Sequence, residues 1–73
     1  MNKTKKVILH LQEFGHINSW EAIQEYGATR LSSIIFNLRY KYNMNIKSER
    51  IQFVDRYGDK GQFVNYVLEG NNE

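Results

Sequence analysis

The spacing of hydrophobic residues in the first part of the chain is that of an amphipathic helix. Val7, Leu11 and Phe14 lie three or four positions apart, so they fall on one side of such a helix. Gly15 follows them and suits the left-handed conformation that commonly ends a helix. The pattern predicts a first helix over residues 4–14.

A second, shorter helix is predicted directly afterwards. Asn18 is a favourable N-cap and Glu21 follows three residues later, so the two side chains can cap the backbone reciprocally. The helix should end at Tyr26, because Gly27 can reverse the chain.

A third helix is predicted over residues 30–42, with Thr29 as its N-cap. Its apolar residues gather in one stripe at about 100° per residue. They are Leu31, Ile34, Ile35, Leu38 and Tyr42. Because only Ala28 separates Gly27 from Thr29, the second and third helices form a tight helix-turn-helix pair.

After Ile46 the apolar period changes to two, as expected for β-strands. The alternating residues are Ile51 and Phe53 in a first run and Val64, Tyr66 and Leu68 in a second. Residues 55–61 between them are polar, basic and contain glycine, which is typical of a hairpin loop. Three helices followed by a two-stranded β-hairpin predict an α+β winged helix-turn-helix domain, whose wing is the hairpin. We expect this domain over residues 1–70 and a short polar tail over residues 71–73.

A chain of 73 residues has room for a single domain with a small core. We expect Phe14, Trp20, Phe53 and Tyr66 to belong to that core, because large aromatic side chains bury much apolar area. The chain has no cysteine and therefore no disulfide or thiolate site. The apolar run after the basic N-terminus is too short for a signal peptide or a membrane span, so we expect a cytoplasmic location.

Positive charge is concentrated in the middle of the chain. Residues 1–28 carry three basic and three acidic side chains, whereas residues 29–60 carry seven basic and three acidic ones, a formal charge of +4. A contiguous basic segment is what contact with nucleic-acid phosphates requires. Ordinary solubilising charge would also explain an excess of this size.

No combination of residues indicates catalysis or metal binding. His10 and His16 have no neighbouring aspartate and no metalloprotease-type spacing, so we expect them to be exposed or half-buried. Glu21 and Glu25 are explained by capping and solvent exposure. The sequence therefore predicts a protein without enzymatic activity, cofactor, metal ion or small-molecule substrate.

Two predicted elements together offer side chains suited to double-stranded DNA. One is the side of the third helix opposite its apolar stripe, and the other is the hairpin loop. The residues are Thr29, Arg30, Ser32, Ser33, Asn37, Arg39, Tyr40 and Lys41 on or beside the helix, and Arg56, Tyr57 and Lys60 in the loop. Each one alone is equally well explained as a solvated side chain, so the prediction rests on their combination.

Residues 17–32, INSWEAIQEYGATRLS, followed by Ile35, Leu38 and Arg39, resemble a family of small winged helix-turn-helix proteins common in bacteriophage and prophage genomes. The resemblance implies a DNA-binding domain of three helices and a β-hairpin. The resemblance also implies that Thr29 caps the recognition helix and that both Arg30 and Arg39 lie near the DNA backbone. Residues 56–60 would form the wing.

The expected function is that of a DNA-binding accessory or transcription-regulatory protein encoded by a phage or prophage and located in the cytoplasm of the bacterial host. Residues 30–42 would enter the major groove and residues 55–61 would lie on the DNA backbone. Because one module makes a small interface, specific binding would require a homodimer or tandem copies.

Three apolar residues leave an alternative open. The family more often has polar residues at the positions of Leu9, Ile34 and Phe36. Phe36 falls close to the DNA-facing side of the third helix, where it would meet a thymine methyl group or another protein. The alternative function is a protein-interaction module that binds or inhibits a host protein through these residues.

Overall fold

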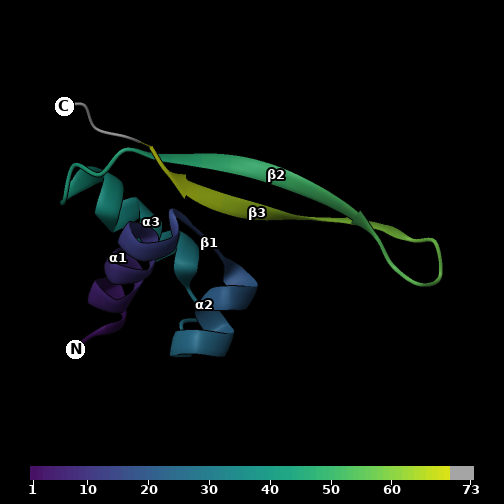
Figure 1. The fold of residues 1–73 in the computed structure, drawn as a ribbon, viewed down its shortest axis with the longest axis horizontal. Helices are drawn as coiled ribbons and strands as arrows, with labels where there is room; N and C mark the ends of the chain where they lie inside the picture. Colours follow the sequence, from purple (N-terminus) through teal and green to yellow (C-terminus); the bar gives the residue numbers. More distant parts are fainter. Residues whose placement is uncertain (70–73) are drawn as a thin grey trace.

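The structure, a computed structural model, describes residues 1–69, which form three helices and a three-stranded antiparallel sheet (Figure 1). The elements are α1 (Lys3–Phe14), β1 (His16–Asn18), α2 (Ser19–Tyr26), α3 (Leu31–Tyr40), β2 (Ile46–Val54) and β3 (Lys60–Leu68). The predicted α+β winged helix-turn-helix fold is confirmed, with one strand more than expected. The predicted tail, residues 71–73, lies outside the described residues.

The first two helices end and begin as their local sequence predicts. Gly15 takes a φ of 83°, and its N–H donates to the carbonyl of Leu11 at 2.8 Å. At the start of α2, the Asn18 side chain accepts from the Glu21 N–H at 2.8 Å, and the Glu21 carboxylate accepts from the Asn18 N–H at 3.1 Å. This reciprocal capping satisfies two backbone donors that the helix itself cannot pair.

The additional strand, β1, joins the helices to the hairpin. It pairs antiparallel with β3, with Ile17 opposite Tyr66, so the strand order is β1-β3-β2. The Leu68 N–H also donates to the carbonyl of Gly15 at 2.8 Å. A strand of three residues is too short for an alternating pattern to predict, and its residues equally fit the approach to α2.

The core is aliphatic and lies between the helices and one face of the sheet. Its buried members are Val7, Leu11, Ile17, Ala22, Ala28, Leu31, Ile35, Leu38 and Ile46. Tyr66 packs against this core. The expected place of Phe14, Trp20 and Phe53 in the core is wrong, because their side chains are exposed by 56%, 68% and 46%. Aliphatic side chains from the helices, the first two strands and the turn before α3 fill the small interior, and these three aromatic residues lie outside it.

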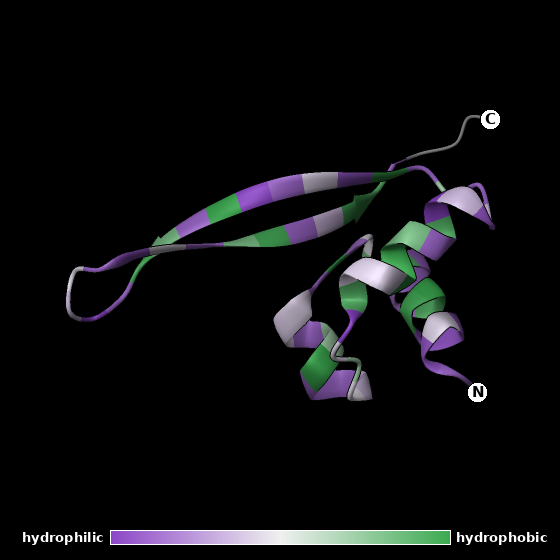
Figure 2. Cartoon of the chain, turned by 180° about the vertical axis from the view of Figure 1, so that it is seen from behind, coloured by the Kyte–Doolittle hydropathy of each residue, from purple (hydrophilic) through white to green (hydrophobic). Residues whose placement is uncertain are grey.

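The hairpin of β2 and β3 projects beyond the helices (Figure 1). The two strands pair over nine positions, from Ile46 opposite Leu68 to Val54 opposite Lys60, and the molecule measures 43 Å along its longest axis. Hydrophobic bands continue along both strands beyond the helices (Figure 2). Within residues 1–69, every helix is too short or too polar to span a lipid bilayer.

Candidate nucleic-acid interface

The turn between α2 and α3 determines where the third helix begins. Gly27 takes a φ of 64°, and the N–H of the buried Ala28 donates to the carbonyl of Ala22 at 3.0 Å. Because this reversal extends through Thr29, Arg30 is the N-cap of α3, and its side chain makes no capping hydrogen bond. The prediction that Thr29 caps this helix is therefore wrong, and Thr29 lies exposed in the turn.

The third helix ends at Tyr40, two residues earlier than predicted. Asn43 takes a left-handed φ of 54°, and the Met44 N–H donates to the carbonyl of Leu38 at 3.0 Å. This closure over the last turn places Met44 against the core. Tyr42 lies outside the helix and is exposed, so its predicted place in the apolar stripe is wrong.

The face of α3 that points away from the core is open and uncharged. Its exposed side chains are Ser32, Ser33, Phe36, Asn37 and Tyr40. The rings of Phe36 and Tyr40 contact each other, with centroids 4.6 Å apart. Exposed Arg30 and Lys41 flank the helix at its two ends, and residues 26–48 contain no acidic residue at all. This arrangement offers hydrogen-bonding side chains in the centre and positive charge at both ends.

Among the predicted DNA-binding residues on α3, Arg39 alone is half-buried. Its Nε donates to the carbonyl of Ile46 at 3.0 Å, and its Nη2 donates to Ser48 Oγ at 2.8 Å. The guanidinium also lies 6.0 Å from the centre of the Tyr66 ring. Arg39 therefore connects the helix to the hairpin, a role that the sequence did not predict.

The tip of the hairpin is organised by Asp55. Its Oδ1 accepts hydrogen bonds from the N–H groups of Tyr57 and Asp59, at 2.8 and 3.0 Å. Gly58, with a φ of 85°, donates its N–H to the carbonyl of Asp55 at 3.0 Å. These bonds hold the loop while the side chains of Arg56 and Tyr57 remain exposed, Tyr57 by 82%. Asp55 was not among the predicted site residues, although aspartate before a glycine-containing turn is a local signal for this role.

The helix-facing side of the hairpin adds a basic residue that the sequence prediction omitted. Side chains of directly paired residues lie on the same face, so Arg50, opposite Val64, shares a face with the core residue Ile46. Lys60, opposite Val54, lies on this face nearer the tip. The sequence alone could have placed Arg50 on this face, because Ile46 and Arg50 are four residues apart and residues four apart in a strand share a face.

The three apolar residues of the alternative function differ in their environment. Leu9 and Phe36 are exposed, whereas Ile34 is half-buried and packs against the core. Ile34 is therefore explained by folding alone. Leu9 and Phe36 lie on different helices, α1 and α3.

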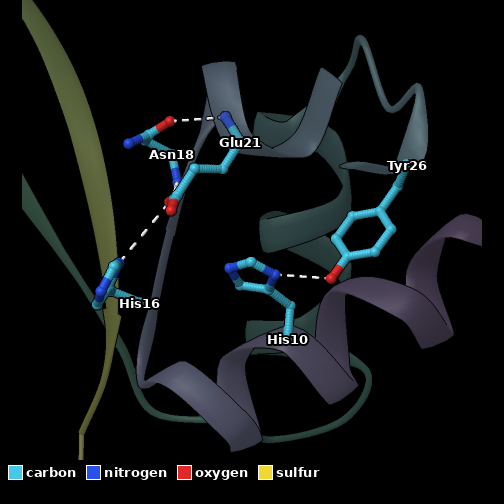
Figure 3. Close-up of polar contacts among 5 residues, drawn as sticks. All are labelled: His10, His16, Asn18, Glu21 and Tyr26. Atoms are coloured by element: carbon cyan, nitrogen blue, oxygen red, sulfur yellow. Dashed lines mark hydrogen bonds and ion pairs between the residues drawn. The ribbon is translucent and has the colours of Figure 1, made fainter. Parts of the chain in front are cut away.

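A polar cluster between α1 and α2 is separate from these surfaces (Figure 3). His10 is buried, contrary to expectation, and its Nδ1 lies 2.7 Å from the hydroxyl of Tyr26. Its Nε2 has no hydrogen-bond partner among the described residues. His16 is exposed, as expected, with Nδ1 3.7 Å from the carboxylate of Glu21. Residues 1–69 contain no group of three histidine or acidic side chains arranged to hold a metal ion.

The same cluster shifts the titration of Tyr26. Burial of its hydroxyl raises the pKa of Tyr26 above the ordinary value of 10.0. The negative charges of Glu25, Glu13 and Glu21 raise the pKa further. Tyr26 is therefore a neutral hydrogen-bonding partner of His10 at physiological pH.

Comparison with protein families agrees with this geometry. Residues 2–70 match the family model described as a winged helix-turn-helix domain. Neither the comparison with curated proteins nor that with solved structures gives a match. The winged helix-turn-helix fold supports a DNA-binding function. Because the match extends over nearly the whole chain, this protein belongs to the winged helix-turn-helix domain family.

Proposed function

We propose that this chain binds double-stranded DNA, with α3 in the major groove and the hairpin tip against the flanking sugar-phosphate backbone. We further propose that it acts as an accessory or transcription-regulatory protein encoded by a phage or prophage. The observation that supports DNA binding best is the exposed face of α3, which has small polar side chains in its centre and basic residues at both ends.

The chemistry of this face suits a groove. The major groove of B-DNA is about 12 Å wide and admits an α-helix. Asn37 can pair with an adenine edge, and the hydroxyls of Ser32 and Ser33 can reach bases or phosphates. Phe36 and Tyr40 can contact a thymine methyl group and the adjacent backbone.

The basic residues would provide most of the affinity. Arg30 and Lys41 flank the groove-facing side chains, while Arg56 and Lys60 lie on the projecting hairpin. Each phosphate that such a residue neutralises releases counterions, which makes the affinity depend on salt concentration. Tyr57 at the hairpin tip is exposed and can add a backbone hydrogen bond.

The direct test is fluorescence anisotropy with a labelled random-sequence duplex across a salt series. The wild-type affinity should fall steeply with salt, and Arg30→Ala should reduce the slope of log K against log salt by about 0.9. A double variant, Arg56→Ala with Lys60→Ala, should reduce it by up to twice as much. Lys5→Ala removes the same charge from an exposed position on α1 and should leave the slope unchanged.

Two results would contradict DNA binding through this surface. One is the absence of binding at low salt, and the other is an equal effect of Arg30→Ala and Lys5→Ala. The regulatory role requires a second step, in which a site selected from a random pool is placed beside a reporter promoter. Reporter expression that does not respond to the protein would argue against regulation.

A second candidate function is supported by the contacting aromatic pair on α3. Phe36 is exposed by 61%, and no charged residue lies between Arg30 and Arg39, so this face also suits a protein partner. In that case the module would bind or inhibit a host protein. A pull-down from host lysate tests this, because Phe36→Asp should abolish capture of the partner, and capture of the same proteins by both forms would argue against it.

A further inference from the structure

The two faces of the hairpin have different chemistry. The face that continues from the core carries Arg50, Lys60 and the paired Gln52 and Gln62. The opposite face carries Ile51 directly paired with Phe63, followed by Phe53 paired with Gly61. The first face therefore holds basic and amide side chains beside Val54 and Val64, whereas the second gathers three large apolar side chains beyond the opposite charges of Lys47 and Glu49.

The apolar face is extended by Trp20 from the first turn of α2. Trp20, Phe53 and Phe63 line one surface hollow of about 450 Å³ together with Asn18 and Gln62. The rings of Phe53 and Phe63 have centroids 6.1 Å apart. We call Trp20, Ile51, Phe53 and Phe63 the outer apolar patch.

Gly61 makes room for one of the rings in this patch. A side chain at this position would collide with the ring of Phe53, so the absence of a Cβ lets that ring lie over the partner strand. Such cross-strand covering of glycine by an aromatic ring fixes the ring's position on the face. Phe53 is therefore held flat against the hairpin, although it remains exposed by 46%.

Ile51, Phe53 and Phe63 belong to the hairpin, which projects beyond the helices (Figure 1), and Trp20 of α2 lines the same hollow as the two phenylalanines. Beyond β1, whose pairing with β3 ends at Asn65, the hairpin continues as a two-stranded ribbon. Two strands alone are marginally stable in water, and a ribbon with an apolar face needs a third strand or a covering surface. Large exposed apolar patches in soluble proteins usually mark sites of protein contact.

The charges around the patch indicate what covers it. The charged strand residues on this face are Lys47 and Glu49, and their charges cancel. A strongly acidic or basic partner would therefore meet no complementary charge here. Two copies of this chain, each with a formal charge of +2, repel least when the basic faces bearing Arg50 and Lys60 point away from each other.

We propose that the outer apolar patch is the contact surface for a second copy of this chain, which forms a symmetric dimer through the outer faces of the two hairpins. In this arrangement the same residues of both copies meet around a two-fold axis. The basic face of each hairpin and the exposed face of α3 remain accessible.

The size of the patch sets the strength of the dimer. A large aromatic side chain buries about 150 to 250 Å², so four half-exposed residues offer a few hundred square ångströms per copy. This area is less than the roughly 800 Å² per partner of a standard stable interface. We therefore expect a reversible dimer with a dissociation constant on the order of tens of micromolar.

The test is analytical ultracentrifugation of the full 73-residue chain, without DNA, over a wide concentration range. The wild-type mass should rise from monomer to dimer. Trp20 is the only tryptophan, so its fluorescence should shift to shorter wavelength as the protein is concentrated. Trp20→Gln and Phe63→Gln should each weaken the dimer at least about tenfold, as expected for aromatic residues at the centre of an interface.

Phe36→Gln is the matched control, because it removes an exposed aromatic ring from α3. Circular dichroism verifies that each variant is folded, and Trp20→Gln keeps the test valid if Phe63→Gln unfolds. A wild-type chain that stays monomeric without a fluorescence shift overturns the proposal, as does a dimer that Phe36→Gln weakens as much as Trp20→Gln does. The measurement contains no DNA, so its failure would leave the proposed DNA binding intact.

Discussion

Arg39 on α3 donates a hydrogen bond of 2.8 Å to the hydroxyl of Ser48 on β2. A second bond, from Arg39 Nε to the carbonyl of Ile46, holds the same two elements together. Helix α3 and the hairpin are thereby coupled through one side chain. In the proposed complex their relative orientation decides whether both can reach the same DNA duplex, so this contact would bear on function as well as on stability.

Arg39→Met should therefore destabilise the fold and weaken DNA binding without much change in salt dependence. The loss of hydrogen bonds from a half-buried guanidinium should lower the free energy of unfolding by about 1 to 2 kcal/mol. Two of its nitrogens are already occupied within the protein, which leaves it poorly placed to neutralise a phosphate. Urea unfolding and the anisotropy salt series measure the two effects.

Lys41→Met is the matched control, because Lys41 is exposed at the end of the same helix. It should change the salt slope and leave stability nearly unaltered. If Arg39→Met reduced the slope as Lys41→Met does, while leaving stability unchanged, Arg39 would be a phosphate contact, as the sequence predicted.

A second prediction concerns the hairpin tip. Asp55→Ala removes the acceptor for the N–H groups of Tyr57 and Asp59, so the loop should lose its defined shape and DNA binding should weaken several-fold. Asp55→Asn removes the same negative charge and keeps an acceptor oxygen. Asp55→Asn should therefore bind DNA at least as tightly as the wild type. Equal losses of DNA affinity in Asp55→Ala and Asp55→Asn would show that the ordering of the loop by this acceptor is irrelevant.

The parts of the fold that depend on local sequence could be predicted. Gly15 and the pair of Asn18 and Glu21 determine helix ends through bonds within a few residues, and the structure confirms them. The start of α3 depends instead on the burial of Ala28, which is a tertiary contact. The strand β1 exists only because β3, some fifty residues later, provides a partner.

The candidate interface shows the same contrast between features set by local sequence and features set by tertiary contacts. The exposure of Ser32, Asn37 and Phe36 follows from helical periodicity and was predictable. Whether an arginine faces solvent or a neighbouring element is not periodic, so the contact of Arg39 with the hairpin could not be predicted. The surroundings of Trp20 are also tertiary, because it lines a surface hollow with Phe53 and Phe63, which lie more than thirty residues later, and no local pattern specifies this.

The third prediction concerns the buried His10 and its half-buried partner Tyr26. Tyr26→Phe removes the hydroxyl that lies 2.7 Å from His10 Nδ1 and leaves a buried imidazole without this partner. The free energy of unfolding should fall by about 1 to 3 kcal/mol. The double variant His10→Leu with Tyr26→Phe should be more stable than the sum of the two single losses predicts, because an apolar pair leaves no polar atom unsatisfied.

Urea unfolding of the four proteins at neutral pH measures this coupling. Tyr57→Phe is the control, because that hydroxyl belongs to an exposed side chain at the hairpin tip, and its loss should have little effect. Strictly additive losses from His10→Leu and Tyr26→Phe would show that the two side chains do not interact in solution.

The fourth prediction concerns alkaline pH. The folded state raises the pKa of Tyr26 above 10.0, so it holds this proton more tightly than the unfolded chain does. The contribution of Tyr26 to stability is therefore complete below pH 10.0 and is lost as the pH rises from there through the higher pKa of the folded state. Phenylalanine has no such proton, so the stability advantage of the wild type over Tyr26→Phe should be constant at neutral pH and narrow above about pH 10.

Urea unfolding of both proteins from neutral pH to about pH 11 measures this difference. Other titrating groups cancel in the comparison, so a difference that stays constant over the whole range would show that burial and the neighbouring carboxylates do not perturb Tyr26.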